Sequence, residues 1–297
     1  MGHRSWVTAL SPIPHSPFPL PTTMNDLLSL LHLPFMQRAI VGGVLMGMLG
    51  GLLGCFVTLR QLSFFSHAVG HAALVGIAIG ILLELNPTWM LLPFTIAFGL
   101  AALYLIDRTN LWSDTILSII LSGALAIGVI LTSFIQSYRG NLTGVLFGDI
   151  LAIDTPDLIL TGGLLVITAG IILTTLPQQI LITLNQSVAK VQGIAVQFHR
   201  YLFVVLLSLT VAVSIKAIGI LLVNAFLVIP ASTARLLSVR FDRFLGLSIV
   251  LGAFSSITGM LVSILWNFPS GPSIVLMQFL MFLLALGLQR FLAKPVT

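Results

Sequence analysis

The chain has 297 residues, of which 58% are apolar and only 7% are Asp, Glu, Lys or Arg, and its mean hydropathy is +1.13. Soluble domains carry about 25% charged residues, so this composition excludes a soluble globular protein and predicts one embedded in a lipid membrane. The net charge of +5 comes from 13 Lys and Arg that are scattered between apolar runs, a pattern that excludes nucleic acid as a partner.

Residues 1–24 are proline-rich and precede the apolar runs. They lack the continuous apolar stretch of a secretory signal, so we predict a flexible N-terminal tail over 1–24 and a transmembrane domain over 25–297. The sequence leaves open whether translation starts at Met1 or at Met24.

Long apolar runs recur along the rest of the chain and predict an all-α, polytopic integral membrane helix bundle. A spanning helix needs roughly 20 residues. The two runs on either side of Lys216 are short enough to form a broken or re-entrant helix, so the prediction is eight or nine transmembrane helices. The runs cover 39–59, 67–83, 90–106, 115–134, 158–176, 201–215, 217–229, 245–265 and 273–288.

Charged residues between the runs predict the orientation. With nine alternating crossings, one side of the membrane receives Arg60, Arg108, Lys190, Arg200, Arg235, Arg240, Arg243, Arg290 and Lys294, and the other receives Arg4, Arg38, Arg139 and Lys216. Because Lys and Arg accumulate in cytoplasmic loops, the first side is predicted to be cytoplasmic. The opposite side collects Asp26, Glu84, Asp149, Asp154 and Asp157, an acidic bias that would concentrate cations, although ordinary solvated loops explain the same residues.

In the first predicted helix, Gly43, Gly47 and Gly51 are spaced by four residues and share one face. Glycines at this spacing let a second membrane helix approach closely, so we predict a packing surface there.

Two histidines stand out in the segment LRQLSFFSHAVGHAALVGIAIG, residues 59–80. His67 and His71 are four residues apart at the start of an apolar helix, which puts both rings on one face. Neutral imidazoles so placed bind a borderline metal such as zinc through one ring nitrogen each. Ionisable residues at membrane depth are costly, which favours a role in a transport pathway. The alternative is a pair that only hydrogen-bonds to neighbours or to interfacial water.

Motifs of catalysis are missing from the sequence: it contains no GxxxxGK[ST] P-loop, no HExxH pair and no GxSxG elbow. We therefore predict that the chain is not an enzyme and that energy for transport comes from a partner.

The segment IGILLVNAFLVIPASTARLLSVRFDRFLG, residues 218–246, is predicted to contain a docking surface. An apolar helix is expected to end at Pro230 and to pass into a turn of small residues that permit close approach, followed by arginines that can pair with carboxylates of a cytoplasmic protein. These residues are Pro230, Ala231, Ser232, Thr233, Ala234, Arg235, Arg240 and Arg243. A plain positive-inside loop explains the arginines equally well.

Five segments, at 35–80, VLFGDILAIDTPDL at 145–158, VAKVQGIAV at 188–196, IGILLVNAFLVIPASTARLL at 218–237 and FPSGPSIVL at 268–276, resemble the zinc/manganese-type permease family of bacterial ABC importers. The resemblance covers nearly the whole chain from residue 35 onward. It implies a multi-pass protein of the bacterial inner membrane that holds no permanent cofactor and transports Zn²⁺ or Mn²⁺. The implied partners are a second copy of the chain, a cytoplasmic ATPase and a periplasmic metal-binding protein.

The resemblance also has one departure. In that family the helix carries an acidic residue and, four positions later, a histidine, and both line the metal pathway. Here His71 matches the histidine, but His67 stands at the acidic position. An imidazole in place of a hard carboxylate favours zinc over manganese.

By the same resemblance, the turn after Pro230 is expected to insert into the ATPase, and the loop at 178–200 is a second candidate for that role. The alternative function is a self-sufficient metal channel or a secondary transporter that uses the same histidines. The lack of acidic residues within the apolar runs argues against a proton-coupled carrier.

Overall fold

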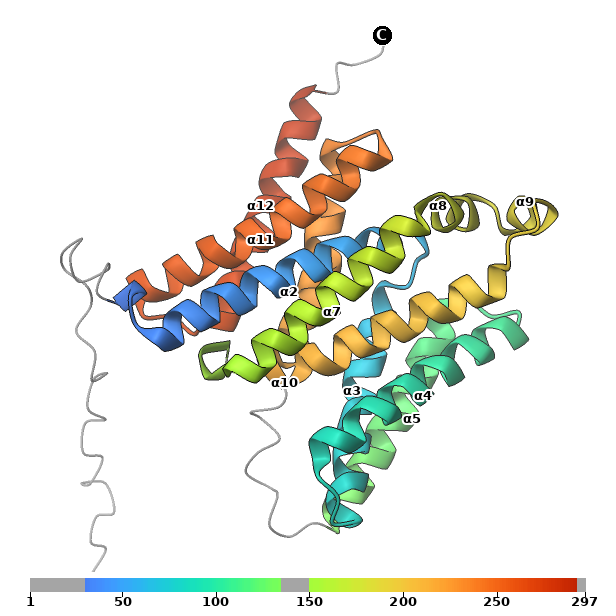
Figure 1. Ribbon diagram of the computed structural model, residues 1–297, viewed down its shortest axis with the longest axis horizontal. Coiled ribbons are helices and arrows are strands. Elements are labelled where there is room, and N and C mark those ends of the chain that lie inside the picture. The colour runs from blue at the N-terminus through green and yellow to red at the C-terminus, as the bar shows by residue number, and fades with distance from the viewer. Residues whose placement is uncertain (1–29, 135–149, 293–297) are drawn as a thin grey trace, which may run out of the picture.

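The computed structural model describes residues 30–134 and 150–292, and within these residues eight helices are long and apolar enough to cross a membrane. The predicted all-α membrane bundle is confirmed, whereas the predicted tail over 1–24 lies outside the described residues. The elements are α2 (Pro34–Leu59), α3 (Ser63–Leu82), α4 (Pro87–Arg108), α5 (Ser113–Ser133), the 3₁₀ turn η1 (Ile150–Ala152), α7 (Thr155–Thr174), α8 (Leu176–Leu184), α9 (Gln186–Val191), α10 (Val196–Leu237), α11 (Phe241–Trp266) and α12 (Ser270–Leu292) (Figure 1).

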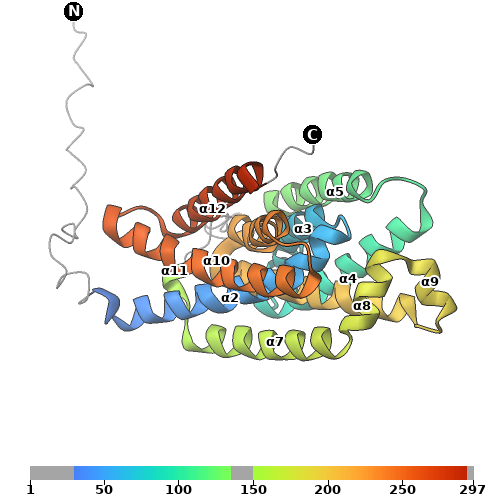
Figure 2. The ribbon, with the colours of Figure 1, turned by 90° about the horizontal axis from the view of Figure 1, so that it is seen from above.

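Helices α2, α3 and α10 form the centre of the bundle. Figure 2 shows α7 along one face and α5 and α12 along the opposite face, with α2, α3 and α10 between them. The four largest fully buried side chains all belong to these central helices: Phe56, Phe65, Phe203 and Phe226. The outer helices instead expose apolar side chains such as Ile119, Val166 and Leu284, as lipid-facing helices do.

Helix α10 spans 42 residues but is broken at Gly219, whose φ of 78° and ψ of 162° are not helical. An unbroken helix of this length would extend about 63 Å, twice the roughly 30 Å apolar thickness of a bilayer. The ribbon changes direction at the break (Figure 1). The segments 196–218 and 220–237 are each long enough for one crossing, which gives nine candidate crossings within the described residues.

Three ion pairs between different helices agree with this topology. They are Arg200–Asp107 (2.6 Å), Arg38–Asp154 (3.5 Å) and Lys216–Asp157 (2.7 Å). The first pair joins the end of α4 to the start of α10, and the other two lie where α2 and α7 begin and where the first segment of α10 ends. Nine alternating crossings place both members of every pair on one side of the membrane, and the side that holds Arg200 is cytoplasmic by its excess of basic residues.

The glycine face of α2 is a packing surface, as predicted. A Cβ atom at Gly51 would lie 2.5 Å from the carbonyl oxygen of Ser248 in α11, and one at Gly47 would collide with the backbone of Gly252. Ser248 Oγ donates a hydrogen bond of 2.8 Å to the carbonyl oxygen of Gly51. Because no side chain separates the two backbones, α2 and α11 pack closely along this face, and α10 packs against both.

Candidate functional site

His67 and His71 lie in the first half of α3, one helical turn apart, with their ring centroids separated by 4.6 Å and their ring planes inclined by 79°. The ring of Phe64 lies 5.4 Å from that of His67 and extends the same face towards the start of the helix. The predicted shared face of the two histidines is therefore present.

This face of α3 is the side that the described helices leave uncovered. Most of α3 is buried against α4, α5 and α10, yet Phe64, His67, His71 and Leu74 are only half-buried. Their spacing of three and four residues defines a single stripe along the helix. An ion, water or a second protein chain can reach the imidazoles along this stripe without displacing the core.

One ring nitrogen of this pair lacks a protein partner. His71 Nδ1 is buried and has no hydrogen-bond partner within the described residues. A buried polar atom without a partner costs about 1–3 kcal/mol, so its presence calls for a functional reason. Because Nδ1 is buried, it is not the nitrogen that an ion on the uncovered stripe would meet; a metal ligand would use the other ring nitrogen and leave Nδ1 to an ordered water.

No cluster of three or more His, Cys, Asp or Glu side chains that could hold a metal ion occurs in the parts of the chain that the structure describes. One chain therefore offers two imidazoles here, which is half of a tetrahedral zinc shell. Further ligands would come from a second chain or from water.

A polar contact that the sequence did not point to lies directly beside the histidines. Ser66 Oγ donates a hydrogen bond of 2.7 Å to Oδ1 of Asn224, in the second segment of α10. One turn further along α3, a Cβ atom at Gly70 would lie 2.8 Å from Ile220 Cγ2. The segment that follows the Gly219 break thus packs on α3 at the level of the histidines. The signal in the sequence was a single asparagine inside an apolar run.

The predicted docking turn after Pro230 is wrong in its local structure. Helix α10 continues through Pro230 to Leu237, and the exposed turn comes later, at 238–240. Pro230, Ala231, Thr233 and Ala234 are buried, and Ser232 is half-buried. A proline is tolerated inside a membrane helix where neighbouring helices compensate for the missing hydrogen bond.

The small residues around Pro230 serve helix packing instead. A Cβ atom at Gly50 would lie 2.7 Å from the carbonyl oxygen of Phe226, the group that Pro230 cannot bond, and one at Gly54 would lie 3.2 Å from Cβ of Ala231. These small side chains let α2 approach α10 closely. They are not a surface that a partner can reach.

The three arginines of the predicted docking surface, Arg235, Arg240 and Arg243, are all exposed at the cytoplasmic end of the bundle. Arg240 forms an ion pair of 3.3 Å with Asp242, and both side chains are more than 70% exposed. The arginines therefore remain accessible to a cytoplasmic partner.

The short helices α8 and α9 lie at the same end of the bundle (Figure 1). They expose Leu184, Val188 and Val191, with 77%, 42% and 90% of each residue accessible. The side chain of Asn185 caps α9 by accepting hydrogen bonds from the backbone N–H groups of Ser187 and Val188. Exposed apolar side chains on a capped helix outside the apolar core of the membrane are typical of a protein contact surface.

Comparison with known proteins gives a consistent picture. The model of the ABC 3 transport family matches residues 32–289. The chain is 32% identical to the high-affinity zinc uptake system membrane protein ZnuB of Haemophilus influenzae, over 84% of this chain and 95% of that protein. It is 31% identical to the manganese import system permease protein ScaB of Streptococcus gordonii, over 88% and 95%.

Among solved structures, PsaBC from Streptococcus pneumoniae in complex with Fab contains a chain that is 30% identical, with a TM-score of 0.77 over 89% of this chain and 95% of that one. A structure described as an inward-facing ABC transporter of the metal-chelate type has a TM-score of 0.65 at 18% identity over 89% and 90%, which shows the fold alone.

Proposed function

The chain belongs to the ABC 3 transport family, and from this premise we propose that it forms the ion pathway of an ATP-driven importer that prefers zinc to manganese. It is a non-catalytic permease subunit that crosses the bacterial inner membrane several times, in an importer for zinc or manganese. A self-sufficient channel is set aside, because the family works with a separate ATPase.

The observation that carries the proposal is the uncovered His67–His71 pair, whose rings lie 4.6 Å apart and whose His71 Nδ1 is unpartnered among the described residues. Two chains that face each other across a pathway would bring four imidazoles together, enough for a tetrahedral zinc ion. Manganese prefers oxygen ligands, and this pair supplies none. The ion would be held only transiently, because conduction requires release as well as binding.

We propose that α8 and α9 form the principal contact with the ATPase and that Arg240 and Arg243 form its border. The exposed apolar side chains of α8–α9 support this, since apolar anchors contribute most of the affinity in protein interfaces. The arginines around the turn at 238–240 would pair with carboxylates at the rim, where charge affects orientation more than affinity. The periplasmic metal-binding protein would meet the opposite end of the bundle.

The test is metal uptake by proteoliposomes that contain the chain, its ATPase and its binding protein. We expect ATP-dependent Zn²⁺ uptake that exceeds Mn²⁺ uptake, and at least a tenfold loss of Zn²⁺ uptake in His71→Ala with unchanged assembly. His32→Ala is the matched control, because His32 is exposed and lies outside the pair. Normal uptake by His71→Ala would refute the site, and a preference for Mn²⁺ would refute the assignment of the ion.

A further inference from the structure

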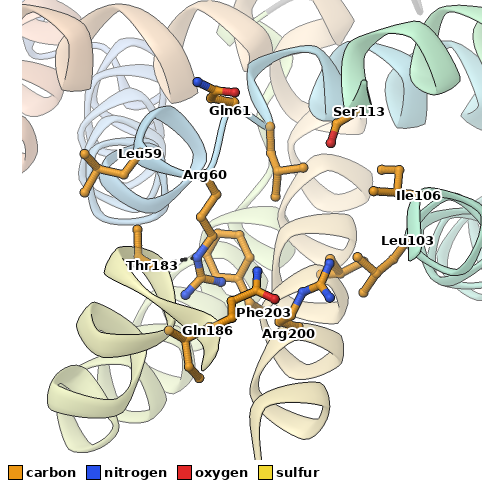
Figure 3. Close-up of a pocket in the computed structure, with 13 residues that line it drawn as sticks. Leu59, Arg60, Gln61, Leu103, Ile106, Ser113, Thr183, Gln186, Arg200 and Phe203 are labelled. Carbon is orange, nitrogen blue, oxygen red and sulfur yellow. Dashed lines mark hydrogen bonds between the residues drawn. The ribbon is translucent and has the colours of Figure 1, made fainter. Parts of the chain in front are cut away.

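A pocket of about 280 Å³ opens at the cytoplasmic end of the bundle, between the α2–α3 turn, the end of α4, the start of α5, α8–α9 and the start of α10. We call it the Arg60 pocket. Figure 3 shows Arg60 and Arg200 entering it from different elements, with Thr183, Gln186 and Ser113 nearby. Its wall also includes the apolar side chains of Leu103, Ile106 and Val204. The pocket is thus basic and polar on one side and apolar on the other.

Arg60 is held rigidly in this pocket without a carboxylate. Its Nε donates to Thr183 Oγ1 at 3.0 Å, and its Nη2 donates to Gln179 Oε1 at 2.6 Å and to the carbonyl oxygen of Gln179 at 3.3 Å. The guanidinium carbon lies 4.5 Å from the ring centroid of Phe203. Every contact of Arg60 in the described part of the chain is with a neutral group, so its charge is oriented but not neutralised.

No acidic side chain among the described residues balances the positive charge of Arg60. Burial, and then repulsion from Arg200, lower the pKa of Arg60 to about 10, so Arg60 is still charged at neutral pH. Arg200 is neutralised by Asp107 at 2.6 Å, and no described acidic side chain pairs with Arg60. The fully buried Gln179 also has an amide nitrogen, Nε2, that lacks an acceptor within the described residues.

We propose that the Arg60 pocket binds a phosphate group, supplied by an anionic phospholipid of the inner leaflet. Nε and Nη2 of Arg60 are already engaged, whereas Nη1 has no acceptor among the described residues and can donate charge-assisted hydrogen bonds to a phosphate oxygen. The pocket lies at the cytoplasmic boundary of the membrane, where basic pockets between helices bind anionic headgroups. Its apolar wall would meet the glycerol and the start of an acyl chain. Free inorganic phosphate has the same chemistry and is the second source that the experiment must separate.

The experiment is native mass spectrometry of the full-length chain released from micelles that contain phosphatidylglycerol or phosphatidylcholine. We expect one phosphatidylglycerol per chain to be retained at least tenfold more strongly than phosphatidylcholine, whose choline cation would face Arg60. Arg60→Gln should abolish this difference. Arg108→Gln is the matched control, because Arg108 is also cytoplasmic but is exposed over Tyr104 and lies outside the pocket lining.

Each outcome decides the proposal. Loss of bound phosphatidylglycerol in Arg60→Gln, but not in Arg108→Gln, supports a phosphate site that is filled by a lipid. Displacement of the lipid by millimolar inorganic phosphate supports the same site with free phosphate as its ligand. Equal retention in all three proteins, or no retention by the wild type, overturns it. If Arg60→Gln does not fold, Gln186→Glu, which places a carboxylate in the pocket lining, should likewise abolish the preference for phosphatidylglycerol. No metal is used in this experiment, so its result is separate from that of the uptake assay.

Discussion

The break in α10 leads to a prediction that links backbone geometry to transport. Gly219 has φ 78° and ψ 162°, a region that is essentially restricted to glycine. Replacing Gly219 with Ala should therefore destabilise the protein by roughly 1–3 kcal/mol if the break is kept. If the helix straightens instead, its second segment must leave Gly70 and lose the hydrogen bond between Asn224 and Ser66. Either response changes the surroundings of His67 and His71.

Two controls separate strain from function. Gly193 also has a positive φ, of 79°, so Gly193→Ala should likewise lose stability; because Gly193 lies just after α9, the proposed ATPase contact, the binding of this variant to the ATPase is measured alongside. Gly123 lies within α5, where an added Cβ would meet nothing within 4 Å, so Gly123→Ala should be neutral or stabilising by up to about 1 kcal/mol.

The assay measures the fraction of monodisperse protein after heating in detergent and the rate of ATP-dependent Zn²⁺ uptake by proteoliposomes. We expect Gly219→Ala to lose stability and at least tenfold in uptake rate while its binding to the ATPase is unchanged, whereas any loss of uptake in Gly193→Ala should accompany weaker binding to the ATPase. The reasoning is refuted if Gly219→Ala resists heating as well as Gly123→Ala does and transports at the wild-type rate.

Two further predictions concern the two ends of the bundle. Lys216 and Asp157 form a partly exposed ion pair of 2.7 Å, so Lys216→Met should lower the free energy of unfolding by less than about 1 kcal/mol. A double-mutant cycle with Asp157→Asn should give a coupling energy that shrinks at high salt. A coupling energy that does not depend on salt would contradict this. Val191 is 90% exposed on α9, so Val191→Asp should leave the permease folded and weaken its binding to the ATPase at least tenfold, as measured by co-purification. Unchanged binding would indicate that the ATPase contacts the turn at 238–240 instead.

Features that depend on local sequence were predicted well. The apolar runs locate the membrane helices because a spanning helix must be apolar along its whole length. The spacing of Gly43, Gly47 and Gly51 predicts a packing face because residues four apart share one side of a helix. The same periodicity brings His67 and His71 together. None of these features requires knowledge of what a helix packs against.

The course of α10 could be predicted only in part. Lys216 interrupts the apolar run and pointed to a break, but the backbone breaks three residues later, at Gly219, where glycine alone adopts the required φ. Lys216 stays in the helix because its long side chain reaches Asp157 at the outer end of the bundle. Pro230 looked like a helix end, but the helix continues past it where Gly50 of α2 approaches the backbone of Phe226, a contact between residues 176 positions apart in sequence.

Arg60 shows why the rest could not be read from the sequence. By pattern it is one more basic residue in a cytoplasmic loop. Its acceptors, Gln179 and Thr183, lie 119 and 123 positions away, so its burial depends on the tertiary fold alone. The stripe of α3 that contains the histidines is uncovered for the same kind of reason, because only the packing of α4, α5 and α10 decides which face stays open.

These long-range contacts also connect the cytoplasmic end of the protein to the proposed metal site at His67 and His71. Arg60 is bonded to α8 through Gln179 and Thr183, and only two residues separate it from the first residue of α3. His67 follows one turn into that helix. If a bound ATPase displaces α8, either the start of α3 would move with it or the hydrogen bonds of Arg60 would break. Breaking them would leave the guanidinium of Arg60 buried with fewer partners. Because the second outcome is costly, we expect α8 and the histidine end of α3 to move together, which would couple the proposed ATPase contact at α8 to His67 and His71.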